Sequence, residues 1–242
     1  MNITVVIPTY NEAKNLPNLI DSLFNLPLDI NILIVDDHSP DGSGELAEEM
    51  AQNSAGRLEV IHRPSKLGLG SAYIVGFKTA LKKGAQAVAQ MDADFSHPPQ
   101  KLIEMADALS NVDVAMGSRY IHGGSLDSAW PPWRKSLSRF GNFYARVILG
   151  IPIHDVTGGY RLWRSTALER MPLERVRSNG YAFQVEMAYL AYRLGMRFQE
   201  IPFYFADRRW GQSKMSWSIQ REAAWRVWQL LWEYRDLHRQ NP

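Results

Sequence analysis

The sequence contains no cysteine in its 242 residues, and this absence excludes three kinds of chemistry. The chain can form no disulfide framework, no thiolate metal site and no cysteine nucleophile. It also lacks an apolar run near the ~20 residues that a transmembrane helix needs, and its first residues carry neither the basic segment nor the cleavage site of a signal peptide. We therefore expect a chain that does not cross a membrane, and these absences permit a cytoplasmic location.

A large excess of positive charge is also missing. The formal net charge is +2, whereas a protein that coats nucleic acid needs a larger excess, so we expect no nucleic-acid partner. Arginine is nevertheless concentrated in the second half of the chain, which favours an anionic ligand or an anionic lipid. With 45% apolar and 21% charged residues and no low-complexity tract, the chain has the composition of a folded globular protein.

Apolar strands alternate with amphipathic helices through the first half of the chain. Strands are predicted at 3–7, 30–36, 58–62, 86–91 and 112–117, and helices at about 12–25, 42–53, 69–83 and 99–109. This alternation indicates an α/β fold with a mainly parallel, doubly wound sheet that helices cover on both faces.

The second half is predicted to continue this pattern less regularly, with a helix at about 132–149, a short strand after Gly158-Gly159, a helix at 181–195, a strand at 197–207 and a last helix at about 216–238. We divide the chain into a catalytic domain, residues 1–215, and a C-terminal amphipathic helix, residues 216–242. A loop rich in Gly, Ser and Pro at 120–131 is predicted to be a mobile lid.

Polar residues follow four of the predicted strands. They are "PTYNE" (8–12), Asp36-Asp37, Asp92-Ala93-Asp94 and "GSRY" (117–120). Because ligands of open α/β sheets bind at the carboxyl ends of the strands, these residues should converge on one cleft. The glycine fingerprints that cradle phosphates are absent, and we interpret "LGLGSA" (67–72) as a turn and a helix start.

The pair Asp92 and Asp94 is the most specific of these signals. Residues two apart on an extended strand point to the same side, and paired carboxylates suit a hard divalent cation such as Mg²⁺ or Mn²⁺. A solvated turn is the alternative interpretation of this pair taken alone. The carboxylates of Asp36 and Asp37 follow a second strand, and together with Asp92 and Asp94 they favour a nucleotide-binding site over a solvated turn. The six histidines do not have the spacing of a zinc site.

A series of motifs stands in the order seen in glycosyltransferase family two. They are "VVIPTYNEAKNLPNLI", "ILIVDDHSPDGS", "LGLGSAYIVGF", "MDADFSHPP", "GSRY", "TGGYRL", "GYAFQVEM" and "DRRWGQSK". From residue 3 to about 215, the chain resembles the dolichol-phosphate (polyprenyl-phosphate) mannosyltransferase branch most. The resemblance implies a GT-A fold and a metal-dependent transfer of mannose, with inversion, from GDP-mannose to a dolichyl or polyprenyl phosphate.

The resemblance also implies which residues bind the donor. The nucleotide would be held by Pro8, Tyr10, Glu12, Val35 and Asp37. The diphosphate and the metal would be held by Asp92, Ala93 and Asp94, with Asp92 and Asp94 as metal ligands and Asp94 as the best single ligand. Arg208 and Lys214 would close over the donor phosphates. Some members carry Gln, a metal ligand there, where this chain has Ser96, so the role of Ser96 stays open.

The acceptor requires different chemistry. A sugar hydroxyl must lose a proton to attack, whereas a lipid phosphate is already anionic and needs cations rather than a base. Arginine suits bidentate phosphate contact, and a helix N-terminus can assist it. By resemblance, Arg119 and Arg134 would bind the acceptor phosphate and act with Asp94 in catalysis, with Ser138 nearby.

The sequence is also compatible with two other functions. A family-two transferase could instead use a UDP- or dTDP-sugar and a saccharide hydroxyl, with Glu186 or Asp155 as the base. A module that binds a sugar nucleotide without turnover is the second alternative.

The C-terminal helix carries a stripe of tryptophans, Trp225, Trp228 and Trp232, at helical spacing. Such a stripe can pack on the catalytic domain or on a second subunit, or it can lie in a membrane surface. Because a polyprenyl tail stays in the bilayer, we expect peripheral attachment at the cytoplasmic face of a membrane. Whether a separate membrane-anchoring subunit takes part is left open.

Overall fold

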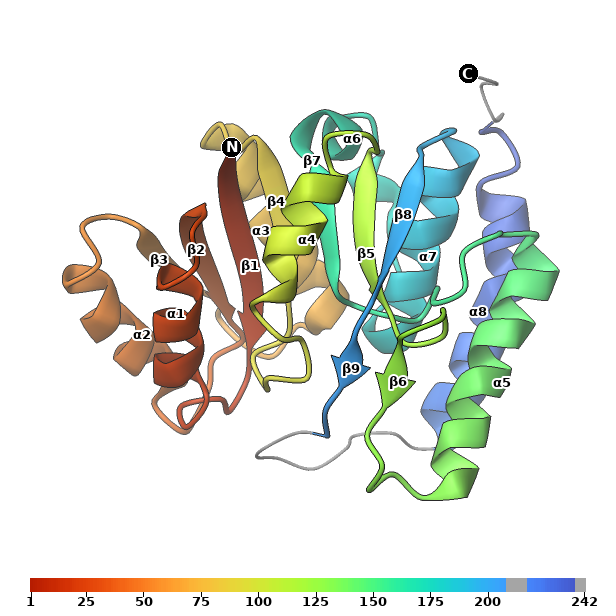
Figure 1. Cartoon of the computed structure of the whole chain (residues 1–242), viewed down its shortest axis with the longest axis horizontal. Helices are drawn as coiled ribbons and strands as arrows, with labels where there is room; N and C mark the ends of the chain where they lie inside the picture. Colours follow the sequence, from red (N-terminus) through yellow and green to blue (C-terminus); the bar gives the residue numbers. More distant parts are fainter. Residues whose placement is uncertain (208–216, 238–242) are drawn as a thin grey trace.

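A computed structural model describes residues 1–207 and 217–237, with side chains described up to 207 and from 224 to 237 (Figure 1). The first half alternates as predicted through β1 (Asn2–Thr9), α1 (Leu16–Phe24), β2 (Asp29–Asp36), α2 (Ser43–Gln52), β3 (Leu58–His62), α3 (Leu69–Lys82), β4 (Ala87–Gln90), α4 (Lys101–Ala108) and β5 (Val114–Ser118). The second half contains β6 (Ser125–Leu126), α5 (Pro132–Leu149), β7 (Arg161–Arg164), α6 (Ser165–Glu169), a short 3₁₀ turn (Leu173–Arg175), α7 (Gly180–Arg193), β8 (Phe198–Pro202), β9 (Tyr204–Phe205) and α8 (Trp217–Glu233).

Seven strands form the central sheet in the order β3-β2-β1-β4-β7-β5-β8. Every pairing is parallel except those of β7, which runs antiparallel between β4 and β5. The predicted α/β fold with a mainly parallel sheet is therefore confirmed. The antiparallel direction of β7 within the sheet was not predicted, because a four-residue strand carries no local signal of its direction. A separate two-stranded sheet pairs β6 with β9.

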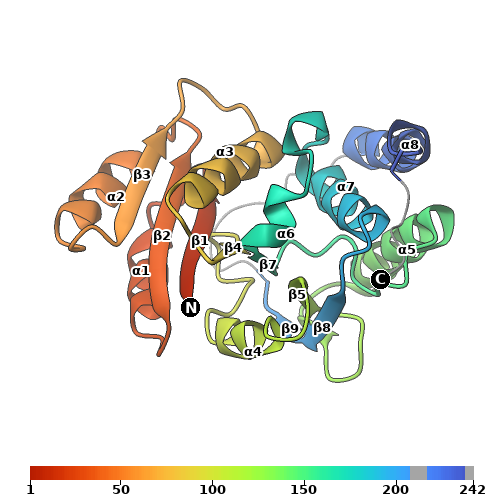
Figure 2. The ribbon, with the colours of Figure 1, turned by 90° about the horizontal axis from the view of Figure 1, so that it is seen from above.

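The alternation of side chains along β1 builds a core on each face of the sheet. Val5 and Ile7 belong to the core that α1 and α4 cover, whereas Val6 belongs to the core that α3 and α7 cover. Figure 2 shows these helices on opposite sides of the sheet. Burial on both faces explains why the strands read as continuous apolar runs rather than as alternating ones.

Helices α5 and α8 lie side by side at one end of the molecule (Figures 1 and 2). The hydroxyl of Tyr144 on α5 donates to the carbonyl of Ala224 (3.1 Å) and accepts from Nε1 of Trp228 (2.9 Å). Val227 and Leu230 of α8 are buried in the same hydrophobic core as residues of α5 and α7. Among the described residues, no helix is long and apolar enough to span a bilayer.

The glycines of "LGLGSA" allow the start of α3 to lie close to the backbone of the segment before α7. Gly68 has a φ of +98° before α3 begins at Leu69, as predicted for a turn and a helix start. A Cβ on Gly70 would lie 2.4 Å from the backbone oxygen of Ser178, so only glycine lets α3 pack against the segment before α7. The N–H of Gly70 donates to Oδ1 of Asn179 at 3.1 Å in the same contact.

Candidate active site

Strands β1 and β2 bring the predicted nucleotide residues to one edge of the sheet. Pro8 pairs with Val35 in register, and the N–H of Asp37 donates to the carbonyl of Thr9 at 2.9 Å. Val35 is fully buried, so its side chain belongs to the core and only its backbone borders this edge. The predicted convergence of these two strand ends is therefore present in the fold.

The carboxylate of Asp37 is held by groups that follow β3. Its Oδ1 accepts from Nη1 of the buried Arg63 at 2.5 Å, and its Oδ2 accepts from the N–H of Gly68 at 2.9 Å. Arg63 also donates to Oγ of Ser71 at 2.6 Å. These contacts fix Asp37 in a defined orientation before any ligand binds.

Tyr10 and Glu12 lie in the loop between β1 and α1. The ammonium group of Lys66 lies 3.8 Å from the centre of the Tyr10 ring. The N–H of Glu12 donates to Oγ of Ser43 (2.8 Å), and its carboxylate accepts from Nδ2 of Asn15 (2.7 Å). The loop is thereby tied to the N-terminus of α2.

The segment with Asp92 and Asp94 is a turn rather than the end of a strand. Strand β4 ends at Gln90, and Phe95 has a φ of +62°. The expectation that both carboxylates share the face of an extended strand was therefore wrong in its geometry. Oδ1 of Asp92 accepts from the hydroxyl of Tyr73 (3.0 Å), and Oδ1 of Asp94 accepts from the N–H of Ser96 (3.0 Å).

The charges of both carboxylates nevertheless affect the pKa of the same buried side chain, Tyr73. Burial raises the pKa of the Tyr73 hydroxyl well above its usual value, and the charges of Asp92 and Asp94 raise it further. Oγ of Ser96 is buried and has no hydrogen-bond partner among the described residues. Carboxylate and hydroxyl oxygens are the ligands that Mg²⁺ and Mn²⁺ prefer, so this turn fits a hard divalent cation.

His97 stabilises this turn as a neutral side chain. Its Nδ1 accepts from the N–H of Asp92 at 3.0 Å, and its ring stacks on Tyr160 with 4.8 Å between ring centres. Burial lowers the pKa of the imidazole although Asp92 and Asp94 act in the opposite direction. The ring therefore keeps the lone pair that the backbone N–H of Asp92 requires.

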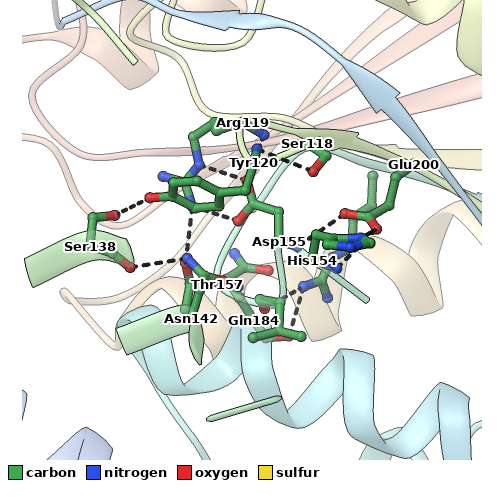
Figure 3. A network of polar contacts seen from close by, with 12 residues as sticks. Ser118, Arg119, Tyr120, Ser138, Asn142, His154, Asp155, Thr157, Gln184 and Glu200 are labelled. Carbon is green, nitrogen blue, oxygen red and sulfur yellow. Dashed lines mark hydrogen bonds and ion pairs between the residues drawn. The ribbon is translucent and has the colours of Figure 1, made fainter. Parts of the chain in front are cut away.

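Arg119 follows β5 and forms a bidentate ion pair with Asp155 (Figure 3). Its Nε donates to Oδ2 and its Nη2 to Oδ1 of Asp155, both at 2.7 Å. The backbone N–H of Arg119 donates to the same carboxylate at 2.9 Å. Burial lowers the pKa of the guanidinium, but the Asp155 carboxylate more than offsets this and the pKa is raised, so Arg119 stays charged.

Further hydrogen bonds connect Arg119 to α5. Nη2 of Arg119 donates to Oγ1 of Thr157 (2.9 Å), which also accepts from Nδ2 of Asn142 on α5 (2.8 Å). The hydroxyls of Tyr120 and Ser138 are hydrogen-bonded to each other at 2.6 Å. Figure 3 shows Arg119 and Ser138 within this one network, so the structure brings these two predicted residues together.

Arg134 lies in the first turn of α5. Its Nη1 is 3.5 Å from Oδ1 of Asp207, and its guanidinium carbon lies 3.5 Å above the centre of the Trp130 ring. Arg134 therefore extends from the same helix as Ser138. Arg208 and Lys214, which we expected to close over the donor phosphates, lie outside the described residues.

The two candidate bases, Asp155 and Glu186, are both buried and bound in ion pairs. The carboxylate of Glu186 accepts from the N–H of Ser178 (2.8 Å), from Nη2 of Arg226 (3.1 Å) and from the hydroxyl of Tyr234 (2.7 Å). Arg226 and Tyr234 belong to the C-terminal helical segment, so Glu186 attaches this segment to α7. The carboxylate of Asp155 accepts three hydrogen bonds, all of them from Arg119.

Sequence reasoning missed several residues of the site. Arg63 follows β3, so the strand-end rule that identified Asp37 could have identified it as well. Tyr73, Asn142 and Thr157 come from helices and from a loop, and no spacing in the sequence relates them to Arg119 or Asp92. Their roles follow from contacts between distant segments.

Comparisons with known proteins agree on the family and on the fold. The family model described as glycosyl transferase family 2 matches residues 4–171. Over 92% of this chain, the sequence is 45% identical to polyprenol monophosphomannose synthase from Mycolicibacterium smegmatis, covering 84% of that protein. It is 41% identical to undecaprenyl-phosphate mannosyltransferase from Micrococcus luteus, again over 92% of this chain and over 91% of that protein.

Solved structures resemble this chain at low sequence identity. Mannosyl-3-phosphoglycerate synthase from Rubrobacter xylanophilus matches with a TM-score of 0.65 at 16% identity, over 100% of this chain and 77% of that one. Glucosyl-3-phosphoglycerate synthase from Mycobacterium tuberculosis, crystallised with Mn²⁺, UDP and glucosyl-3-phosphoglycerate, matches with a TM-score of 0.62 at 16% identity, over 96% and 79%. These likenesses show that the fold is that of the GT-A glycosyltransferases.

Proposed function

This chain belongs to glycosyl transferase family 2, and we propose that it transfers a mannosyl group from a nucleotide sugar to a polyprenyl phosphate. An oxygen of the lipid phosphate attacks the anomeric carbon. The bond from that carbon to the diphosphate breaks, and the nucleoside diphosphate leaves with the electron pair. Attack opposite to the leaving group inverts the anomeric configuration.

The pairing of the charged groups around Arg119 and on α7 supports this proposal most directly. Asp155 and Glu186, the two carboxylates considered as bases for a hydroxyl acceptor, are buried in ion pairs. Arg119 is held in its charged form and is linked to the helix that carries Arg134. A site that offers cations and keeps its carboxylates occupied suits an acceptor that is already anionic.

We propose GDP-mannose as the donor. Pro8, Val35, Tyr10, Glu12 and Asp37 would border the nucleotide. The carboxylate of Asp37 already accepts two hydrogen bonds, yet each of its oxygens has a second lone pair that can accept an N–H of a nucleobase. Ala93 would contact the diphosphate through its backbone, and Arg208 and Lys214 would neutralise it.

The turn at 92–96 would hold a divalent cation, Mg²⁺ or Mn²⁺. Asp92 and Asp94 are the proposed ligands, and the unpartnered hydroxyl of Ser96 supports a third oxygen ligand there. A cation bound there would supply positive charge that stabilises the departing diphosphate. The hydroxyl of Tyr73 on α3 donates to Asp92 and the backbone N–H of Ser96 donates to Asp94, and these bonds hold the two carboxylates in place.

We also propose that the protein binds peripherally to the cytoplasmic face of a membrane. Helix α8 exposes Trp225, Trp228 and Trp232, and the neighbouring α5 exposes Phe140 and Phe143. We call this set, with Val147 of α5, the aromatic face. Aromatic side chains favour the boundary between water and hydrocarbon, and α5 also carries Arg134 and Ser138 of the acceptor site. A lipid could therefore present its phosphate while its tail stays in the bilayer.

The decisive experiment is a transfer assay with the full chain, Mn²⁺ or Mg²⁺, undecaprenyl phosphate and a set of GDP-, UDP- and dTDP-sugars, with the lipid product identified by mass spectrometry. We expect mannosyl phosphoryl undecaprenol from GDP-mannose and none in excess EDTA. A glycosylated saccharide with no lipid product would contradict the proposal. Donor binding without any transfer would favour a module that binds sugar nucleotides.

A further inference from the structure

Trp130 supports the guanidinium group of Arg134. The guanidinium carbon lies 3.5 Å above the centre of the indole, and Trp130 is only 7% exposed although it belongs to the surface loop before α5. A cation–π contact uses no N–H group of the guanidinium as a hydrogen-bond donor, and the ion pair of Arg134, from Nη1 to Asp207, is long at 3.5 Å. The indole therefore orients Arg134 without occupying the donors that a phosphate needs.

Phe205 of β9 extends this support toward Arg119. Its ring meets Trp130 edge to face, with 5.6 Å between ring centres and an interplanar angle of 79°. The guanidinium carbon of Arg119 lies 5.2 Å from the centre of the same Phe205 ring. Trp130 and Phe205, which we call the aromatic bridge, thus connect the two arginines through ring contacts.

The backbone around the aromatic bridge is fixed by the small sheet of β6 and β9. The N–H of Asp127 donates to the carbonyl of Phe205 at 2.9 Å. The carboxylate of Asp127 accepts from the N–H of Asp207 (2.8 Å) and from the N–H of Ala129 (2.9 Å). Asp127 therefore joins the loop that carries Trp130 to the strand that carries Phe205, so the two rings keep their relative position.

We propose that Trp130 is a positioning residue for the acceptor phosphate. It fixes the orientation of Arg134 directly, and through Phe205 it sets the position of Arg134 relative to Arg119. This inference rests on the proposed function, since its ligand is the phosphate of the lipid acceptor. An arginine that is oriented before binding loses less conformational freedom when the phosphate arrives, so the indole should lower the KM for the acceptor and leave donor binding unchanged.

The test compares Trp130→Leu with Trp130→Phe. The assay uses a short-chain polyprenyl phosphate in detergent, so that membrane attachment plays no part. We expect Trp130→Leu to raise the acceptor KM about 5- to 20-fold, the range of a cation–π contact, and Trp130→Phe to raise it less because a ring face remains. The Kd for the donor, measured by calorimetry without acceptor, should stay within about twofold of wild type. Trp133→Leu, an exposed tryptophan three residues away, is the matched control and should change neither constant.

A double-mutant cycle with Arg134→Ala decides whether Trp130 acts through Arg134. If it does, the variant carrying both Trp130→Leu and Arg134→Ala will have the acceptor KM of Arg134→Ala alone. The inference would be overturned if the two substitutions had additive effects on the acceptor KM, or if the donor Kd rose as much as the acceptor KM. If Trp130→Leu does not fold, the same cycle with Trp130→Phe gives the answer. A failure of the proposed function can be distinguished from a failure of this inference, because in the first case the wild-type protein would form no lipid product.

Discussion

The carboxylate of Asp155 binds Arg119 at three points, two on the guanidinium and one on the backbone N–H, from a position 36 residues further along the chain. Both side chains are buried, with exposures of 0% and 7%. Asp155 is therefore a structural partner of a phosphate-binding cation in our proposal rather than a base. The two roles lead to different experimental outcomes.

We expect Asp155→Asn to destabilise the protein and to weaken the acceptor site. Removing one partner of a buried ion pair leaves the other charge uncompensated, which costs about 3–5 kcal/mol. Urea unfolding should show this loss, and the acceptor KM should rise. Asp113→Asn removes a carboxylate whose partner, Arg197, is mostly exposed, so this control should cost less than about 1 kcal/mol. Unchanged stability with a lost kcat would instead identify Asp155 as a base.

Arg134→Ala should weaken the lipid-phosphate acceptor more than the nucleotide sugar. A charge-assisted hydrogen bond contributes about 1.5–3 kcal/mol, so the acceptor KM should rise roughly 10- to 150-fold. Arg139→Ala, an exposed arginine on the same helix, serves as the control in detergent with a short-chain acceptor. Arg119→Ala should have the same selectivity but should also destabilise the fold, because Asp155 stays buried. Equal losses in donor and acceptor binding would refute the assignment of both arginines.

Asp94→Asn should abolish transfer while the fold is retained. The amide oxygen of asparagine can still accept from the N–H of Ser96, but one charge of the proposed cation site is lost. The rate should fall at least about a hundredfold, as expected when electrostatic stabilisation of a leaving group is removed. Asp21→Asn, an exposed carboxylate on α1, is the control. Full activity of Asp94→Asn, or of the wild type in excess EDTA, would disprove the metal site.

The aromatic face should bind liposomes that contain anionic lipid. Trp228 and Trp232 are 47% and 69% exposed, so glutamate at these positions should weaken flotation with liposomes without unfolding the protein. Val75→Glu introduces the same charge at a partly exposed apolar residue of α3 and should have no effect on flotation. If the wild type does not float, with or without polyprenyl phosphate, the face must instead contact a second subunit or a separate membrane anchor.

Gly70→Ala and Gly141→Ala should change stability in opposite directions, although both glycines lie inside helices. A Cβ at Gly70 meets the backbone oxygen of Ser178 at 2.4 Å, so α3 must shift, and the thermal midpoint should fall by several degrees. A Cβ at Gly141 meets nothing within 4 Å, so alanine should stabilise α5 by up to about 1 kcal/mol. A Gly70→Ala variant as stable as wild type would show that the close packing of α3 on Ser178 is absent in solution.

The α/β layout and the clustering of polar residues at strand ends could be predicted from the sequence alone. These features follow from local patterns: apolar runs that form buried strands, helical periodicity between them, and "PTYNE", Asp36-Asp37 and "GSRY" directly after strands. Any parallel sheet places its strand ends at one edge, so the gathering of these polar residues at that edge could be predicted without knowing a single tertiary contact. The roles of the individual residues at this edge stay predictions.

The partners of these residues, in contrast, became known from the folded structure. The ion pair of Arg119 with Asp155, the ring contacts that join Arg134 to Phe205 and the turn that holds Asp92 all depend on segments that are distant along the chain or on one unusual φ. A local pattern reports only which face of a strand or helix is apolar. A buried charge, in contrast, is stable only beside a particular partner, and the packing of the whole domain determines which partner that is.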